Sequence, residues 1–220
     1  PGTPGAISPG TATSGQLASS KSRSLQAYYR NLQTNRLTYG LLRTDGGGID
    51  TPYTSDMLLR NFARIAFFDE YVRGPGSGRG AAQPLRKWTA PLRVRTYFGA
   101  TVTQATRARD TASVTTYCIV LAYGEQAQPH VLRSAIVLIR AELPELMRRS
   151  CIHEELAQGL GLLNDSPDAR PSIFNDDHEF ALLTSHDEAL LTLLYDPRLR
   201  PGQSAQSAMP VVRSRVDMLA

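Results

Sequence analysis

The sequence lacks any long apolar run, and it contains two cysteines and one tryptophan. No stretch of about 18 consecutive apolar residues occurs, so no transmembrane helix is predicted. No charged-then-apolar segment of the secretory type opens the chain. Basic residues do not alternate with aromatic residues as they do on a base-stacking surface, so nucleic acid is not an expected partner. The 220 residues, 41% of them hydrophobic, suffice for one sizeable core.

Charged residues are divided unevenly along the chain, whose net charge is +4. Residues 73–109 carry eight basic side chains and no acidic one, whereas residues 142–188 carry eleven carboxylates and three arginines. We expect the two segments to neutralise each other in the folded protein. An acidic cleft for a cationic ligand is the alternative.

Composition divides the chain into four parts. The first 24 residues are almost wholly Pro, Gly, Thr, Ser and Ala, which bury too little apolar area to offset the entropy of ordering. The predicted parts are a flexible tether at 1–24, an N-terminal extension at 25–53, one domain at 54–202 and a tail at 203–220. A short helix is expected over 24–40, and an edge strand over 209–212 in the otherwise peripheral tail.

Helical and strand patterns alternate within the predicted domain. A helix is expected to begin at Thr54 and end before Gly74, with four apolar residues on one face: Leu58, Phe62, Ile65 and Val72. Alternating side chains predict strands over 92–98, 114–123 and 131–140. The last of these is the most apolar and is expected nearest the sheet centre. The predicted fold class is therefore α+β, with a mixed β-sheet packed with helices.

The most informative stretch is Cys151–Asp165, CIHEELAQGLGLLND. Zinc peptidases of the H-E-x-x-H type place two histidine ligands one helical turn apart around a glutamate base, and a longer form adds a glycine turn and a third ligand. In the register that fits the glycine, the three ligand positions are taken by Glu154, Gln158 and Asn164. Glu155 takes the position of the base, and Gly161 that of the turn. The helix expected near 151–160 thus has a zinc-peptidase layout without its histidines, and neither a metal nor another cofactor is expected.

Shifting this register by one residue does not restore the motif. His153 would then take the first ligand position, but Ala157 would take the second, and alanine cannot bind a metal. The apolar face of the helix is expected to be buried and to comprise Ile152, Leu156, Leu160 and Leu163.

Two features after this helix extend the comparison. Ser172-Ile173-Phe174 lies where zinc peptidases of the metzincin kind have a methionine-containing turn beneath the metal, so Phe174 takes the place of the methionine. Thr184 and Asp187 have the spacing of a capping box at the start of a further helix.

Several of these residues have a second interpretation. Glu154 and Glu155 are equally expected as solvated carboxylates at a helix start. Gln158 and Asn164 fit an ordered hydrogen-bond network better than oxygen ligands of a hard ion. The remaining histidines, at positions 130, 178 and 186, are expected at the surface.

The two cysteines, Cys118 and Cys151, are predicted to form a disulfide. One lies on a predicted strand and the other at the entrance of the predicted helix, and the pair would form in an oxidising compartment. Two buried free thiols are the alternative.

The C-terminal part of the chain resembles a known family. The series EELAQGLGL, ND, SIF, LTSHDEALL and LYDPRLRPG is similar to domain of unknown function family 2927, and Leu58–Phe62 with Lys87–Pro91 extends the resemblance over about 54–202. Members of this family are often classed as bacterial envelope lipoproteins. The resemblance implies a zincin-like fold and a periplasmic or other extracytoplasmic location, with a lipid tether upstream of Pro1, but no established activity.

Two functional hypotheses follow. The first is a binding or scaffolding module of the cell envelope, which holds a protein or peptide partner by strand addition along residues 92–98. The second is a metal-dependent hydrolase or peptidase that uses Glu155 as general base with atypical oxygen ligands. We favour the first, because the aligned positions offer one carboxylate and two neutral amides, which fit no common catalytic zinc set.

Overall fold

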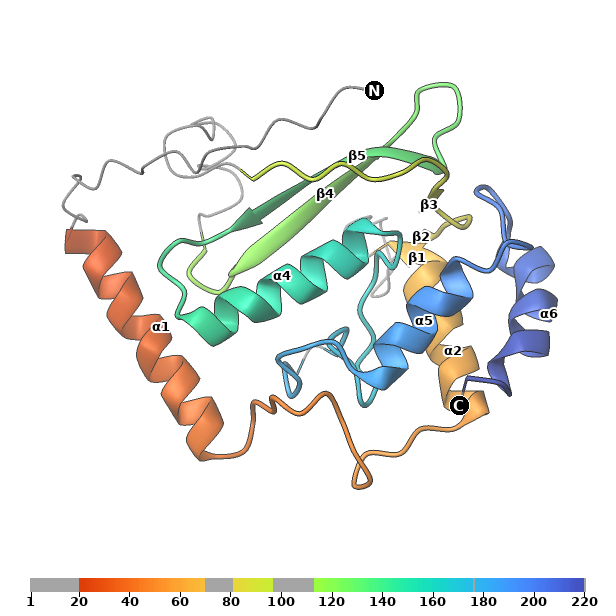
Figure 1. Ribbon diagram of the computed structural model, residues 1–220. Helices are drawn as coiled ribbons and strands as arrows, with labels where there is room; N and C mark the ends of the chain where they lie inside the picture. Colours follow the sequence, from red (N-terminus) through yellow and green to blue (C-terminus); the bar gives the residue numbers. More distant parts are fainter. Residues whose placement is uncertain (1–19, 70–80, 97–112, 176, 220) are drawn as a thin grey trace, which may run out of the picture.

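The computed structural model describes residues 20–69, 81–96, 113–175 and 177–219 (Figure 1). Within these ranges the chain is a mixture of helices and short strands, as the predicted α+β class requires. The elements are α1 (Ser20–Thr38), α2 (Ser55–Ala66), β1 (Phe68–Asp69), β2 (Ala81–Ala82), β3 (Lys87–Trp88), β4 (Cys118–Gly124), β5 (Val131–Ile139), α4 (Glu145–Gly159), α5 (Ser185–Leu194) and α6 (Ala205–Val216). No helix in the described ranges is long and apolar enough to cross a bilayer.

The β4–β5 hairpin is the main part of the sheet. β5 is the central strand in the order β3-β5-β4, and it pairs antiparallel with β4 and parallel with β3. β1 and β2 form a separate antiparallel pair. The strands predicted at 114–123 and 131–140 are thus confirmed with shifted ends, and the more apolar of the two is central as expected.

The strand predicted at 92–98 is wrong in the part that the structure describes. Residues 91–96 form no strand and all are exposed, Val94 to 77%. Alternating apolar and basic residues form a strand only where the apolar side chains pack against a core. Here the apolar and the basic side chains of residues 91–96 are both exposed. Residues 97 and 98 lie outside the described ranges.

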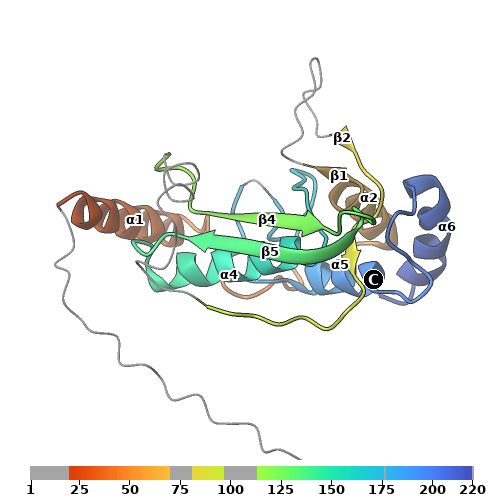
Figure 2. The same cartoon turned by 90° about the horizontal axis from the view of Figure 1, so that it is seen from above.

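Helix α4 lies beneath the β4–β5 hairpin and is bonded to it covalently (Figure 2). The disulfide between Cys118 of β4 and Cys151 of α4, whose Cα atoms are 5.9 Å apart, confirms the predicted pairing. Gly159, near the other end of α4, brings the helix close to the sheet, because a Cβ atom there would lie 3.4 Å from Cγ2 of Val120. Tyr29 of α1 is fully buried against the first turns of α4.

The main core lies among α2, α5 and α6 (Figure 1). Thr54 caps α2 as predicted, since its hydroxyl accepts the Met57 N–H at 3.3 Å. The helix ends earlier than predicted, at Ala66, because β1 begins at Phe68, and Val72 lies outside the described residues. The largest fully buried side chains of this core include Leu58, Phe62, Ile65, Leu190 and Leu193.

The expectation of a peripheral tail with an edge strand at 209–212 is wrong. These residues lie in helix α6, which Ser204 caps by accepting the Ser207 N–H at 3.3 Å. Ala208, Val212 and Val216 recur every fourth residue and are all buried in the main core. Burial of this face against α2 and α5 outweighs the strand preference of the local sequence.

The buried face of α4 is also different from the predicted one. The helix begins at Glu145 and its buried residues are Met147, Cys151, Glu155, Ala157, Gln158 and Gly159. Ile152 and Leu156, which were expected in the core, are 42% and 46% exposed. The cysteine and the glycine fix which side of α4 meets the sheet, so the larger apolar side chains point elsewhere.

Candidate functional site

The residues at the zinc-ligand positions make hydrogen bonds within the protein. Gln158 is buried, and its Nε2 donates to Oδ1 of Asp165 at 3.0 Å. Asn164 is also buried, and its Nδ2 donates to the carbonyls of Arg64, at 3.1 Å, and Asp165, at 2.9 Å. These bonds connect the end of α4 with the following turn and with α2. Glu154 is half-buried on the helix.

Glu155, the residue at the general-base position, lies on the inner face of α4 and is 4% exposed. Among the residues that the structure describes, no three His, Cys, Asp or Glu side chains come together in a way that could hold a metal ion. The functional roles assigned to Glu154, Glu155, Gln158 and Asn164 stay predictions.

Gly161 is the turn residue that the sequence indicated. Its φ of +123° belongs to a region that favours glycine, and its N–H donates to the carbonyl of Gln158 at 2.8 Å. A Cβ atom at this position would lie 2.2 Å from the carbonyl oxygen of Arg86. The turn after α4 therefore requires glycine for two independent reasons, conformation and space.

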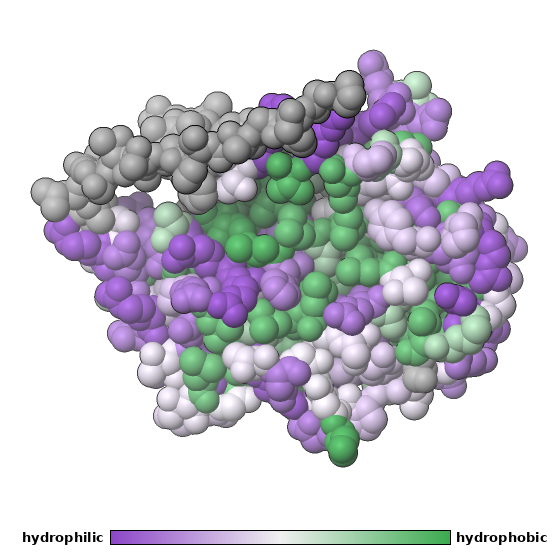
Figure 3. Space-filling model, viewed as in Figure 1, coloured by the Kyte–Doolittle hydropathy of each residue, from purple (hydrophilic) through white to green (hydrophobic). Residues whose placement is uncertain are grey.

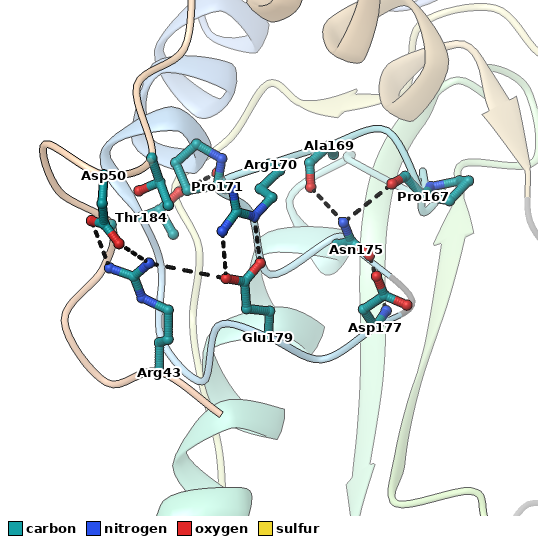
Figure 4. Close-up of polar contacts among 12 residues, drawn as sticks. Arg43, Asp50, Pro167, Ala169, Arg170, Pro171, Asn175, Asp177, Glu179 and Thr184 are labelled. Carbon is teal, nitrogen blue, oxygen red and sulfur yellow. Dashed lines mark hydrogen bonds and ion pairs between the residues drawn. The ribbon is translucent and has the colours of Figure 1, made fainter. Parts of the chain in front are cut away.

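The 172–174 turn contributes to the core. Phe174 is fully buried in the main core, and its carbonyl accepts the Ser166 N–H at 2.8 Å. Asn175 continues this loop, since its Nδ2 donates to the carbonyls of Pro167, at 3.2 Å, and Ala169, at 3.0 Å (Figure 4). A ligand-binding role for Phe174 stays a prediction.

A fully buried carboxylate, that of Asp187, connects this turn with the start of α5. It accepts hydrogen bonds from the Ser172 hydroxyl at 2.5 Å, the Ile173 N–H at 3.0 Å and the Thr184 N–H at 2.9 Å. The Thr184 hydroxyl lies 2.9 Å from both Oδ2 of Asp187 and the Pro171 carbonyl, and it accepts the Asp187 N–H at 3.2 Å. The capping box predicted from Thr184 and Asp187 is confirmed.

His186, expected at the surface, is fully buried. Its Nε2 lies 3.0 Å from Nδ2 of Asn61, and its ring packs edge-on against Tyr53. The expectation failed because α2 covers this side of α5. An amide nitrogen can only donate, so Nε2 accepts from Asn61.

Charged residues of the segment after α1 and of the loop before α5 meet where Nη1 of Arg43 lies 4.0 Å from Oε1 of Glu179 (Figure 4). Arg43 donates to both oxygens of Asp50, at 2.6 and 3.0 Å, and Arg170 donates to both oxygens of Glu179, at 2.6 and 2.8 Å. The hydrogen bonds from Arg43 hold the pKa of Asp50 below its usual value, and those from Arg170 do the same for the pKa of Glu179. Because one partner of each pair is exposed, Asp50 to 66% and Arg170 to 50%, the pairs orient the loop more than they stabilise it.

An apolar groove lies between α4 and the start of α5. It has a volume of about 260 Å³ and is lined by Ile152, His153, Leu156, Ala157, Leu160, Leu183 and Leu191. Figure 3 shows hydrophobic side chains gathered over the region of α4 and α5 on this face of the molecule. The sequence did reveal the stripe of Ile152, Leu156 and Leu160, but such a periodicity is typical of a buried face and so led to the wrong prediction.

His153 is the polar side chain in this groove. Its Nδ1 accepts the backbone N–H of Leu183 at 3.1 Å, which joins α4 to the residue just before the α5 cap. Burial, together with the positive charge of Arg149 one turn earlier, lowers the pKa of His153 from its usual value. The imidazole is therefore neutral at neutral pH.

A family model described as "Protein of unknown function (DUF2927)" matches residues 98–214, a range that contains β4, β5, α4 and α5. No curated protein and no solved structure matches the chain.

Proposed function

We propose that this chain, which belongs to the DUF2927 family of proteins of unknown function because the family model covers more than half of it, is a binding module of the cell envelope. The site is the groove between α4 and the start of α5, and the occupant is an apolar segment of a protein partner. This proposal keeps the binding-module hypothesis but moves the binding surface from residues 92–98 to the outer face of α4.

The exposure of Ile152 and Leu156, at 42% and 46%, is the observation that carries the proposal. The two residues line the groove together with the half-buried Leu160, Leu183 and Leu191, so the apolar surface is continuous. Covering the exposed part of two such side chains would contribute about 1 kcal/mol each. A continuous apolar groove on a folded domain is the feature into which a partner places apolar anchors.

The residues of the zinc-peptidase layout support binding over hydrolysis. A general base must face a substrate, whereas Glu155 is 4% exposed on the inner face of α4. Gln158 and Asn164 use their amide nitrogens in hydrogen bonds to Asp165 and to backbone carbonyls. We infer a zincin-like ancestry from the layout of the helix and the Gly161 turn, with the former ligand positions now serving the fold.

An extracytoplasmic location is part of the proposal. The disulfide between Cys118 and Cys151 supports it, because such bonds form and persist in oxidising compartments. The lipid tether follows from the family resemblance alone. Labelling of the full-length protein with a fatty-acid analogue in producing cells tests it, and an unlabelled protein in the soluble fraction would contradict it.

A peptide library tests the function directly. Purified protein is titrated against fluorescent peptides of about 12 residues that vary in apolar content, and binding is followed by fluorescence polarisation. We expect a subset with closely spaced apolar residues to bind, and Leu156→Asp to weaken this binding at least about tenfold by placing a charge in the groove.

Leu41→Asp is the matched control. Leu41 is 58% exposed on the segment after α1 and does not line the groove, so the variant carries the same chemical change at a similarly exposed leucine. Its peptide binding should equal that of the wild type. Equal binding by the Leu156→Asp and Leu41→Asp variants, or no binding peptide at all, would refute the proposed function.

A further inference from the structure

The first 44 residues of the chain contain no acidic side chain, and the first carboxylate is that of Asp45. The basic residues of this segment include four on α1, namely Lys21, Arg23, Arg30 and Arg36. Figures 1 and 2 both show α1 at the end of the molecule away from α6. The chain thus presents a helix of one charge sign at one end.

The charges next to α1 leave this end positive. Glu142 accepts the Ser22 hydroxyl at 3.1 Å, and Glu145 is paired with Arg149. Arg148, on the same helix as Arg149, is exposed, so the start of α4 adds no net negative charge. A region of positive potential attracts anionic partners, and it does so more strongly at low salt.

One face of α1 packs on the protein, and another is exposed. Tyr29 is fully buried against the first turns of α4. Arg23, Arg30 and Leu37 are exposed and follow one another at intervals of seven residues, which is close to two helical turns. They therefore lie along one line of the helix surface, where two guanidinium groups are followed by an apolar side chain.

The α1 tip, which comprises residues 37–41, exposes three large apolar side chains. Leu37, Tyr39 and Leu41 are 43%, 75% and 58% exposed. Exposed apolar side chains that occur singly need no explanation, whereas a group of them within one short segment indicates an interaction site. The apolar tip and the basic line of α1 are contiguous, because Leu37 belongs to both.

The backbone on both sides of the α1 tip is fixed. The Leu41 N–H donates to the Arg36 carbonyl at 2.7 Å, and Gly40 turns the chain with a φ of +67°. Leu42, the next residue, is buried, and the main chain of Arg43 exchanges hydrogen bonds with that of residues 179–181. The tip side chains are thus held out by an anchored turn, so a partner that covers them orders little further backbone.

We propose that the α1 tip and the adjacent arginines bind the surface of a bilayer that contains anionic lipids. Arg23 and Arg30 contact the phosphate groups, while Tyr39 and the two leucines enter the boundary between headgroups and acyl chains. Tyrosine prefers this boundary because its ring is apolar and its hydroxyl is polar. Helices that combine basic and exposed apolar residues bind in the plane of this interface. The surface is separate from the groove between α4 and α5, so the inference is independent of the proposed function.

The exposed leucines favour lipid over another polyanion that could neutralise the arginines. A single-stranded nucleic acid offers phosphates to the arginines and bases that stack on Tyr39. It offers nothing that removes Leu37 and Leu41 from water, whereas the acyl chains of a bilayer do. A bilayer is thus the partner that engages both the basic and the aliphatic side chains of this surface.

Vesicle flotation of the 220-residue chain with its disulfide intact tests the contribution of charge. Vesicles of phosphatidylcholine are compared with vesicles in which phosphatidylglycerol replaces about a third of it. We expect binding to the anionic vesicles and release at high salt, because salt screens the attraction. Arg30→Gln should weaken this binding about fivefold, whereas Arg213→Gln, at an exposed arginine of α6, should leave it unchanged.

Leu41→Asp tests the α1 tip, and Leu156→Asp is its matched control. Both substitutions place a carboxylate at an exposed leucine. Leu41→Asp should weaken vesicle binding at least about tenfold, because the charge is costly to place among acyl chains, and Leu156→Asp should bind as wild type does. Tyr39→Ser removes the tip ring without adding a charge and should weaken binding about threefold or more. In the peptide assay Leu156→Asp is the impaired variant and Leu41→Asp the control, so failure of this inference and failure of the proposed function are distinct results.

Each contrary result overturns the inference. No binding to anionic vesicles, equal binding to both vesicle compositions, or undiminished binding by both tip variants excludes the bilayer as the partner of the α1 tip. Binding to a single-stranded oligonucleotide without binding to vesicles assigns the basic residues to a nucleic acid. A dimer in light scattering that Leu41→Asp dissociates, again without vesicle binding, assigns the tip to a second copy of the chain.

Discussion

Replacing Asp187 offers the sharpest test of how the site is held in place. The carboxylate is fully buried and accepts bonds from the Ser172 hydroxyl and from the N–H groups of Ile173 and Thr184. Asp187→Ala would leave these donors buried without an acceptor, at about 1 to 3 kcal/mol for each N–H group. Since the serine hydroxyl can rotate toward another acceptor, we expect a total loss of about 3 to 5 kcal/mol.

Asp187→Asn separates the acceptor from the charge. The asparagine oxygen can accept the N–H groups of Ile173 and Thr184, while its amide nitrogen can donate to Oγ of Ser172. The charge assistance of these bonds is lost and the Ser172 hydroxyl must turn to another acceptor, so the expected cost is about 1 to 2 kcal/mol. The two substitutions should therefore differ by at least about 1 kcal/mol.

Urea unfolding followed by circular dichroism measures the effect. With a slope of about 2 kcal/mol per molar urea, a loss of about 4 kcal/mol lowers the midpoint by about 2 M. Glu188→Ala, at the exposed neighbouring position, is the control and should change stability by about 0.5 kcal/mol or less. If Asp187→Ala stayed within about 1 kcal/mol of wild type, or if the alanine and asparagine variants were equally destabilised, the hydrogen-bond account would be refuted.

Three further predictions concern the surrounding elements. The double substitution Cys118→Ser with Cys151→Ser should lower the free energy of unfolding by about 3 to 4 kcal/mol, because the disulfide closes a loop over a sequence separation of 33 residues. A loss below about 1 kcal/mol in unfolding experiments would contradict this estimate. Gly161→Ala should lower the free energy of unfolding by about 3 kcal/mol or more. Gly40→Ala should lower it by about 1 kcal/mol, because Gly40 also has a positive φ but no atom lies within 4 Å of the new Cβ. Equal losses in thermal unfolding would show that the contact with Arg86 is unimportant. The hydrogen bond from Arg198 lowers the pKa of Asp196 from 3.8 to about 2. The ionised carboxylate should therefore stabilise the fold fully above its unfolded-state pKa, and this stabilisation should disappear as pH falls through the folded-state pKa. Asp196→Asn should therefore flatten the stability profile between about pH 4 and about pH 2, and an unchanged profile in urea titrations would rule this contribution out.

The features that could be predicted from the sequence depend on local chemistry. Thr184 and Asp187 have a spacing that satisfies the free N–H groups of a helix start wherever the helix packs. Gly161 follows a helix and adopts a positive φ, as a glycine after the last helical turn commonly does. The Cys118–Cys151 pair was recognisable because the chain contains no other cysteine.

The features that could not be predicted depend on which surfaces meet in the fold. Residues 209–212 suit a strand, yet they lie in α6 because Ala208, Val212 and Val216 together cover the core. The alternation at 92–96 suits a strand, yet no described strand pairs with it. In both segments the deciding partner is distant in the chain, and local periodicity carries no information about it.

The reversed face of α4 shows how such a failure bears on function. A stripe of Ile152, Leu156 and Leu160 normally marks the buried side of a helix, and the buried side here instead carries Glu155 and Gln158. The disulfide at Cys151 and the close approach at Gly159 hold α4 to the hairpin by its polar and small-residue side. Apolar residues that could have stabilised the core are thus left at the surface, where they contribute free energy only when something covers them. Since the same covalent constraint fixes the helix orientation, reducing the disulfide should loosen α4 and weaken peptide binding in the groove together, whereas Leu156→Asp should weaken binding and leave the fold intact.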